Sequence, residues 1–336
     1  MPVSLVVTKP NRATAVRGSG HRVLGPDRGG LEVRMFNVGD GEAILLEFPG
    51  KTAWLVDGGS SNSKFRNRDL AGYLVKYLIE QRLTLTAAVA SHPHVDHIGT
   101  LTYLLPALAR RTSPVAYYYS GVSLGKKGAW LVELEAVVER LKKEGKVMPV
   151  SLRDRHREVP IANGVEAHLF AGSGQGAYTS VFLHLHFGEA SLLFTGDSKC
   201  KYEKALLAAY GREDFRADVL KVTHHGSSTG TARSVVDAVK PAIVIASTSV
   251  DEGHTLEPDV WNDAKGKGRL GPPQRKLETL RDGDIILRTE GKRIQGGILY
   301  EVETDYPGRF AGKLRVPDVS QLEPHEPQAV DQECLS

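Results

Sequence analysis

The sequence has few cysteines and no long apolar segment. Only Cys200 and Cys334 occur among 336 residues, and two cysteines so far apart make a poor disulfide framework. No apolar run approaches the roughly 18 to 20 residues that cross a bilayer. The first residues also lack the apolar core and cleavage site of a secretory signal. We therefore expect a cytoplasmic location and no membrane partner.

The sequence also has little net charge. Its formal charge of +3 is too small to define a partner, but the charges are unevenly distributed. Residues 1–30 form a basic extension, and residues 306–336 form an acidic, proline-containing tail typical of a flexible segment. These segments would flank one domain over residues 31–305. A second basic segment, 264–281, contains Lys265, Lys267 and Arg269; it is either a solvated loop or a track for a phosphate backbone.

Apolar periodicity predicts strands in both halves of the chain, with amphipathic helices between them. The expected strands are 31–38, 42–48, 52–59, 85–92, 115–119, 147–152, 165–170, 180–187, 190–195, 217–225, 241–248, 284–288 and 293–302. The expected helices are 64–81, 98–110, 128–143, 199–209 and 231–239. The first three strands would form a β-meander. The pattern is neither that of a TIM barrel nor of an all-β sandwich. It predicts an α/β (α+β) fold in which two packed sheets have helices outside.

Metal-competent side chains follow three of the expected strands. Residues 90–99, "ASHPHVDHIG", contain His92, His94, Asp96 and His97, the strand "LLFTGD" ends in Asp197, and "LKVTHHGSS" contains His224 and His225. Imidazole and carboxylate ligands together suit Zn, Mn or Fe. The first two histidines can converge on one ion while Asp96 and His97 turn to a second, and Asp197 could bridge both. The alternative is that each histidine merely belongs to a polar loop.

These motifs resemble those of the metallo-β-lactamase fold, whose hallmark is H-x-H-x-D-H. The segments "FNVGDGEAILLEF", "WLVDGG", "SHPHVDHIGTL", "SVFLHLHFGEASLLFTGD", "LKVTHHGSS" and "VKPAIVIAST" are similar to the hydrolase domain of ComEC-type DNA-uptake proteins and their stand-alone relatives. The similarity spans roughly residues 31–250 and is weaker to about 302. It implies a four-layer αββα sandwich. The membrane-spanning part of ComEC proteins has no counterpart here, so DNA transport is not expected.

The resemblance also implies roles for individual residues. His92 and His94 would bind a first ion, Asp96 and His97 a second, and Asp197 both. One of His224 and His225 would complete the second site. Spacing leaves that choice open; our working assignment makes His225 the ligand and His224 catalytic. Asp96 is also taken as a catalytic residue, and Asp57 of "VDGG" would hold the metal loop from behind. The expected cofactors are thus two divalent ions, Zn or Mn.

The sequence departs from the family at the position of a further histidine for the first ion. That position falls near Tyr178, Thr179 and Ser180, as in ComEC-like sequences, which carry a small polar residue there. We therefore place Ser180 beside the substrate. His184 and His186 alternate along a strand and are interpreted as surface residues rather than substitutes.

Two further segments could contact the substrate. Family members often carry a Gly-His-Pro near the site, where this chain has Gly253-His254-Thr255; His254 is therefore predicted to be catalytic. Ser227 either caps the helix expected from about Thr231 or, with that helix start, binds a phosphate.

The motif set predicts metal-assisted hydrolysis by water that the ions activate to hydroxide. No G-x-S-x-G or reactive cysteine constellation offers a covalent nucleophile. The leading hypothesis is a phosphodiesterase or nuclease with DNA or RNA as its partner, because of the resemblance and the basic segments. One alternative is a hydrolase of a small phosphoester or carbonyl compound. The other is a non-catalytic metal-binding scaffold.

Overall fold

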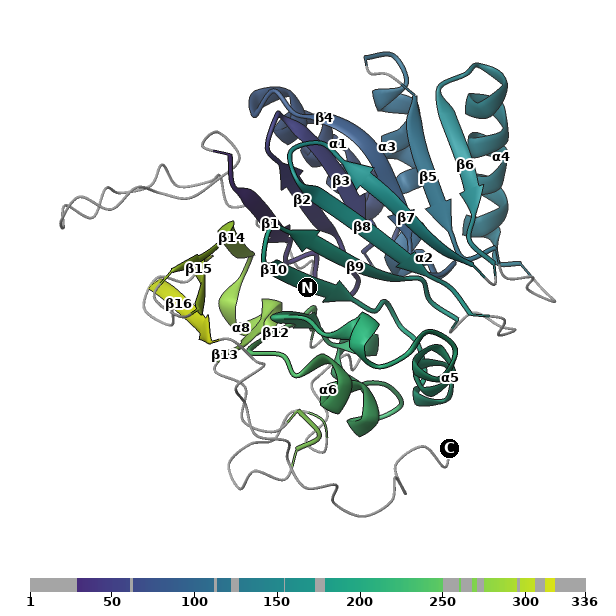
Figure 1. The fold of residues 1–336 in the computed structure, drawn as a ribbon. Helices are drawn as coiled ribbons and strands as arrows, with labels where there is room; N and C mark the ends of the chain where they lie inside the picture. The colour runs from purple at the N-terminus through teal and green to yellow at the C-terminus, as the bar shows by residue number, and fades with distance from the viewer. Residues whose placement is uncertain are drawn as a thin grey trace.

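The computed structural model describes residues 29–60, 63–111, 114–121, 127–153, 155–172, 179–249, 260, 268–270, 275–294, 297–305 and 312–317. Within these ranges the chain forms two β-sheets packed face to face, with helices on both outer faces (Figure 1). This is the four-layer αββα architecture that the sequence predicts.

The first sheet has nine strands in the order β16-β15-β14-β1-β2-β3-β4-β5-β6. β1 to β3 form the expected antiparallel meander, and β3 to β6 run parallel. The strands are β1 Leu31–Met35, β2 Ile44–Phe48, β3 Thr52–Val56, β4 Thr84–Ala90, β5 Val115–Tyr119, β6 Val147–Ser151, β14 Ile285–Ile294, β15 Gly297–Thr304 and β16 Gly312–Pro317.

The second sheet has seven strands in the order β13-β12-β11-β10-β9-β8-β7. β7 to β10 are antiparallel, whereas β10 to β13 are parallel. The strands are β7 His156–Ile161, β8 Val165–Phe170, β9 Phe182–Phe187, β10 Ala190–Phe194, β11 Val219–Lys221, β12 Ile243–Ala246 and β13 Arg275–Glu278.

The helices cover the outer faces of both sheets. α1, α3 and α4 pack on the first sheet, while α5 and α6 pack on the second. The α-helices are α1 Lys64–Glu80, α2 Val95–Ile98, α3 Leu101–Leu108, α4 Ala129–Lys143, α5 Cys200–Tyr210, α6 Arg233–Val239 and α8 Thr279–Asp282, and two 3-10 turns are η2 Glu213–Phe215 and η3 Thr223–Gly226. None of the helices in the described ranges has the length and apolarity that a membrane span requires.

Strand alternation explains the layers. β2, "ILLEF", is buried along its whole length because both of its faces are covered. Ile44 and Leu46 point into the core between the sheets, and Leu45 points into the core beneath the helices. Successive side chains of a strand face opposite sides, so an almost continuous apolar run is what a doubly covered strand needs.

Several boundaries differ from those expected. β7 and β13 lie outside the predicted strands, and β16 extends the first sheet beyond residue 305, where we had placed the start of the tail. The strand predicted over 217–225 ends at Lys221. The chain then turns sharply, because His224 and His225 both adopt left-handed backbone conformations with φ near +50°. Residues 1–28 and 318–336 lie outside the described ranges.

Candidate metal centre

The carboxyl ends of β4, β10 and β11 meet at one edge of the sandwich. The short helix α2 after β4 supplies Asp96 and His97, the turn after β10 supplies Asp197, and η3 after β11 supplies His225. Each offers one ligand atom, and these four atoms all lie within 4.8 Å of one another. The rigid sheets thus bring together residues from distant parts of the sequence.

Asp197 occupies the middle of this cluster. Its Oδ2 atom lies 3.1 Å from His97 Nε2, 3.5 Å from His225 Nε2 and 3.7 Å from His92 Nε2. The Asp96 carboxylate faces the same space, 3.3 Å from His97 Nε2 and 3.6 Å from His225 Nε2. One carboxylate oxygen is therefore within reach of imidazoles from both halves of the H-x-H-x-D-H motif.

The far nitrogen of each central imidazole is held by another group. His97 Nδ1 donates to Asp57 Oδ2 at 2.8 Å, and His225 Nδ1 donates to the Ser247 carbonyl at 3.0 Å. His92 Nδ1 lies 3.1 Å from Ser91 Oγ. A hydrogen bond at Nδ1 fixes the ring orientation and leaves Nε2 facing the cluster, as in metal-binding histidines generally.

Asp57 also ties the metal loop to the sheet. Besides His97, its carboxylate accepts from the Ser91 amide and the Ser91 hydroxyl, both at 2.7 Å. The following glycines let the two segments touch: Gly58 N donates to His97 O at 2.6 Å, and a Cβ on Gly59 would lie 2.3 Å from the Asp96 carbonyl carbon. The "VDGG" sequence is thus explained by one carboxylate and a backbone approach that only glycine permits.

The charges of the cluster point to a cation. Burial alone would raise the pKa of Asp197, but the imidazoles of His97, His225 and His92 outweigh it and hold the pKa well below its usual range. Burial would lower the pKa of His97, yet Asp197 and Asp96 raise it well above its usual value. Among the described residues, the buried Nε2 atoms of His92 and His97 have no hydrogen-bond partner. Two carboxylates facing imidazole nitrogens are a donor set that fits divalent ions.

Sequence reasoning missed a buried pair behind Asp197. Lys221, at the end of β11, is fully buried, and its ammonium forms an ion pair with the buried Glu42. The same Nζ lies 3.2 Å from the Gly196 carbonyl and 3.8 Å from Asp197 Oδ1. Burial would lower the pKa of Lys221, but the carboxylates of Glu42 and Asp197 raise it. A lysine inside an apolar strand was the only signal in the sequence.

Comparison with known proteins agrees with this geometry. The sequence profile described as "Metallo-beta-lactamase superfamily" matches residues 37–249, more than half of the chain. The chain belongs to the metallo-beta-lactamase superfamily. Members of this superfamily are typically hydrolytic enzymes that bind divalent metal ions.

Three relatives match parts of the chain. The chain is 27% identical to Recombination protein 2 of Haemophilus influenzae over 221 residues, 65% of this chain and 24% of that protein. It is 25% identical to ComE operon protein 3 of Bacillus subtilis over 271 residues, 77% of this chain and 32% of that protein. Ribonuclease J of Thermus thermophilus is 47% identical over 74 residues, 21% of this chain and 13% of that protein. The chain thus spans about a quarter to a third of the length of its two competence-type and recombination-type relatives.

His92, His94 and His224 are the other residues of the two histidine motifs, and they border the cluster. The ring of His94 lies with its centroid 4.6 Å from that of His92, and the His92 and His97 centroids are 4.2 Å apart. His224 stands farther out: its Nε2 is 4.0 Å from Asp197 Oδ2, its side chain is 18% exposed, and its Nδ1 lies 2.8 Å from Thr229 Oγ1. His225, by contrast, is buried within the cluster.

Three residues expected to contact substrate have partners within the chain. Ser180 is fully buried, and its hydroxyl accepts from the Asp197 amide at 2.9 Å. Ser227 Oγ lies 3.1 Å from Thr229 Oγ1. Arg269, expected either in a solvated loop or on a track for a phosphate backbone, is only 3% exposed and donates to the Gly230 and Ser228 carbonyls, both at 2.8 Å. His254, Lys265 and Lys267 lie outside the described residues.

The helix start that could have held a phosphate is already occupied. The buried carboxylate of Glu203, from α5, accepts from the Thr231 and Ala232 amides at 2.8 and 2.7 Å, just before α6. An internal carboxylate thus takes the place that we considered for a substrate phosphate, because it satisfies the same free amides. The isolated Glu203 in a helical segment gave no signal of this role.

Proposed function

We propose that this chain is a metal-dependent phosphodiesterase that cuts DNA or RNA. The observation that carries the proposal is the convergence of Asp96, His97, Asp197 and His225 from three strand ends. A pair of divalent ions in such a site lowers the pKa of water toward neutrality and neutralises charge that develops on the scissile group. The chain's own residues then have to hold the ions, admit the substrate and exclude other chemistry.

We assign Asp96, His97 and His225 to one ion, because their ligand atoms and that of Asp197 all lie within 4.8 Å of one another. His92 and His94, whose ring centroids are 4.6 Å apart, would hold the second ion. Asp197 Oδ2 lies 3.1–3.7 Å from the Nε2 atoms of His97, His225 and His92, so it would contact both ions. Lys221 pairs with Glu42 behind Asp197 and thereby orients the Asp197 carboxylate without occupying a ligand position.

The open side of the cluster is where a substrate would approach. Asp96 and His224 lie there with side chains 16% and 18% exposed, and His94 is also partly exposed. His224 Nδ1 lies 2.8 Å from Thr229 Oγ1, which orients the ring and places its Nε2 4.0 Å from Asp197 Oδ2. We therefore assign Asp96 and His224 to the substrate side, and His225 to the metal.

The substrate class rests on the relatives rather than on a groove in the described residues. Ribonuclease J is 47% identical over a segment of 74 residues, and Recombination protein 2 and ComE operon protein 3 match over most of the chain. The name Ribonuclease J denotes cleavage of phosphodiester bonds, a reaction that a two-ion hydrolytic site can carry out.

The test is a cleavage assay on single- and double-stranded DNA and RNA with Mn, Zn or Mg, and with a small phosphodiester in parallel. Wild-type protein should cut at least one nucleic acid in a metal-dependent manner, and Asp197→Ala and His97→Ala should lose this activity. Asp237→Asn, which changes an exposed carboxylate on α6, is the matched control and should cut normally. Cleavage of the small ester alone would contradict the nucleic-acid substrate. Absence of any metal-dependent hydrolysis would contradict the proposal itself.

A further inference from the structure

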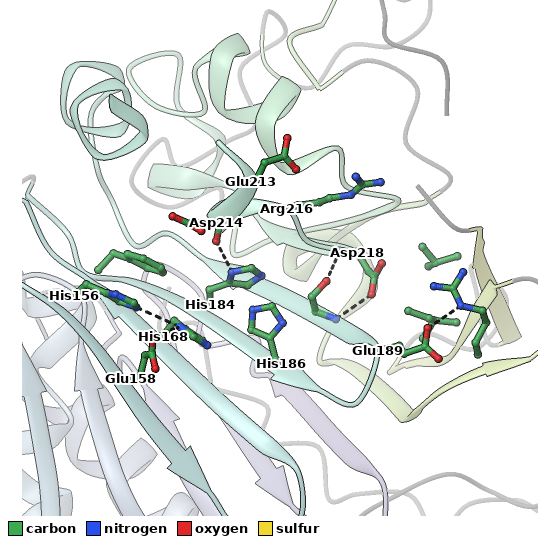
Figure 2. A pocket seen from close by; sticks show the side chains of 15 residues that line it. His156, Glu158, His168, His184, His186, Glu189, Glu213, Asp214, Arg216 and Asp218 are labelled. Carbon is green, nitrogen blue, oxygen red and sulfur yellow. Dashed lines mark hydrogen bonds and ion pairs between the residues drawn. The ribbon is translucent and has the colours of Figure 1, made fainter. Parts of the chain in front are cut away.

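A second group of histidines lies on the outer face of the second sheet. In β8 and β9, Ala167, Leu169, Leu183 and Leu185 point into the core between the sheets. The alternating positions point the other way and place His168, His184 and His186 on the outer face, beside His156 of the edge strand β7 (Figure 2). Four of the chain's 12 histidines therefore gather in one place that shares no residue with the metal centre.

Two of these histidines and the nearby Glu158 have the spacing of metal ligands. His156 Nε2 lies 3.2 Å from His168 Nδ1, and Glu158 Oε1 lies 3.9 Å from the same Nδ1. The three ligand atoms all fall within 4.8 Å of one another. Two imidazole nitrogens bound to one tetrahedral zinc ion at about 2.0–2.1 Å stand roughly 3.3 Å apart. The observed nitrogen separation therefore already matches one edge of such a coordination shell.

We propose that His156, Glu158 and His168 form a second metal site, for a divalent transition-metal ion of the zinc type. The remaining positions of its coordination shell face a pocket of about 580 Å³, which these residues line together with His184 and His186. The ring of His186 has its centroid 5.2 Å from that of His168. Figure 2 shows these side chains facing the same cavity from three adjacent strands.

An independent observation comes from His184. The side chain is 2% exposed, its Nδ1 donates to the Asp214 carbonyl at 2.8 Å, and its buried Nε2 has no hydrogen-bond partner among the described residues. Burial, with His186 nearby, lowers the pKa of His184 to about 3, so the ring is neutral at physiological pH. A neutral imidazole with a free nitrogen on the pocket wall is a group that attracts a metal ion.

The ion would fasten the edge of the sheet. β7 is the terminal strand of the second sheet and is largely exposed, and it pairs with β8 alone. An ion held by His156 and Glu158 from β7 and by His168 from β8 would cross-link the two strands. Metal binding stabilises the folded state by its own binding free energy. The ion would therefore hold β7 on β8 and keep this exposed edge strand in place.

The experiment counts zinc ions per chain after zinc loading and gel filtration, by elemental analysis. His156→Ala and His168→Ala should each hold one ion fewer than the wild type, and cobalt-loaded protein should lose part of its visible absorption. Glu166→Ala removes an exposed carboxylate from the same face of β8, outside the triad, and should retain the full count. His156 is exposed, so its replacement leaves the fold intact.

The same count in an Asp197→Ala background separates this site from the proposed active centre. That variant should still bind the triad's ion, and adding His156→Ala should remove it. Equal zinc counts with and without His156 and His168 in both backgrounds would overturn the second site, whatever the fate of the active centre. Loss of zinc in Asp197→Ala alone would instead concern only the proposed function.

Discussion

Asp57 and His97 are joined by a fully buried hydrogen bond of 2.8 Å, and both side chains are inaccessible to solvent. The same Asp57 carboxylate binds the amide and hydroxyl of Ser91. One carboxylate therefore orients a proposed ligand and fixes the loop that carries the H-x-H-x-D-H motif. The residue acts through His97, because it does not itself face the metal cluster.

Replacing this carboxylate should weaken metal binding more than it weakens the fold. Asp57→Asn keeps the volume but loses one strong acceptor, and removal of such a partner typically costs 10- to 100-fold in metal affinity. A competitive zinc titration should show a loss of about that size. Ser91→Ala, which leaves the His97 contact intact, should show a smaller loss. Equal affinities for Asp57→Asn and wild type would contradict the role of Asp57.

The buried pair of Lys221 and Glu42 should behave as a unit. Lys221→Met leaves the Glu42 carboxylate buried without its cation, which should cost about 3–5 kcal/mol of unfolding free energy. Lys221→Met combined with Glu42→Leu should recover much of this loss. Breaking the exposed Arg233–Asp237 pair with Asp237→Ala should cost less than about 1 kcal/mol. Urea denaturation measures all four proteins, and a double variant less stable than Lys221→Met would refute the coupling.

Arg269 should matter for stability and not for nucleic-acid binding. Its guanidinium donates to the buried Gly230 carbonyl and the partly buried Ser228 carbonyl, and hydrogen bonds from charged groups contribute about 1.5–3 kcal/mol each. Arg269→Met should therefore lower the unfolding free energy by about 2 kcal/mol or more. The salt dependence of nucleic-acid affinity should stay the same, because no phosphate contact is lost. A normal melting temperature of Arg269→Met, together with a weaker salt dependence of nucleic-acid affinity, would show that Arg269 contacts the nucleic acid instead.

His184 should make the metal-free protein sensitive to acid. The ordinary pKa of 6.5 applies to the unfolded chain, whereas burial lowers the folded-state pKa to about 3. Between these values the unfolded chain binds a proton that the folded chain does not, so stability falls as pH decreases from about 6.5. The slope contributed by one such group is at most about 1.4 kcal/mol per pH unit. In EDTA, His184→Asn should show a shallower decline from pH 6.5 to 5 than the wild type; parallel curves would count against this account.

Much of the fold could be predicted because apolar strands dominate the sequence. The run "ILLEF" and the strand before His92 carry strong signals, and the order of the motifs identifies the sandwich. β7 was missed because "HREVPI" is polar, exposed and contains proline. β13 was missed because four residues, "RKLE", lie in a basic segment rich in Gly and Pro. Short edge strands take their conformation from their neighbours rather than from their own pattern.

The candidate metal centre could also be predicted only in part. Spacing gathered the metal-competent residues, yet it could not distinguish His224 from His225, because left-handed backbone at both residues decides which ring enters the cluster. The sequence also could not predict which buried polar groups pair with each other. Glu42 pairs with Lys221, and Glu203 accepts from the amides before α6. Such pairs join segments far apart in the sequence, and only the packing of the two sheets brings them into contact.

The most direct measurement is an anomalous difference map from a zinc-loaded crystal. Two peaks should appear about 3.5–4 Å apart, as in two-metal hydrolytic sites. One should be bonded to His97 and His225, the other to His92 and His94, with Asp197 between them. A zinc-saturated crystal with no peak within bonding distance of Asp197 would contradict the account.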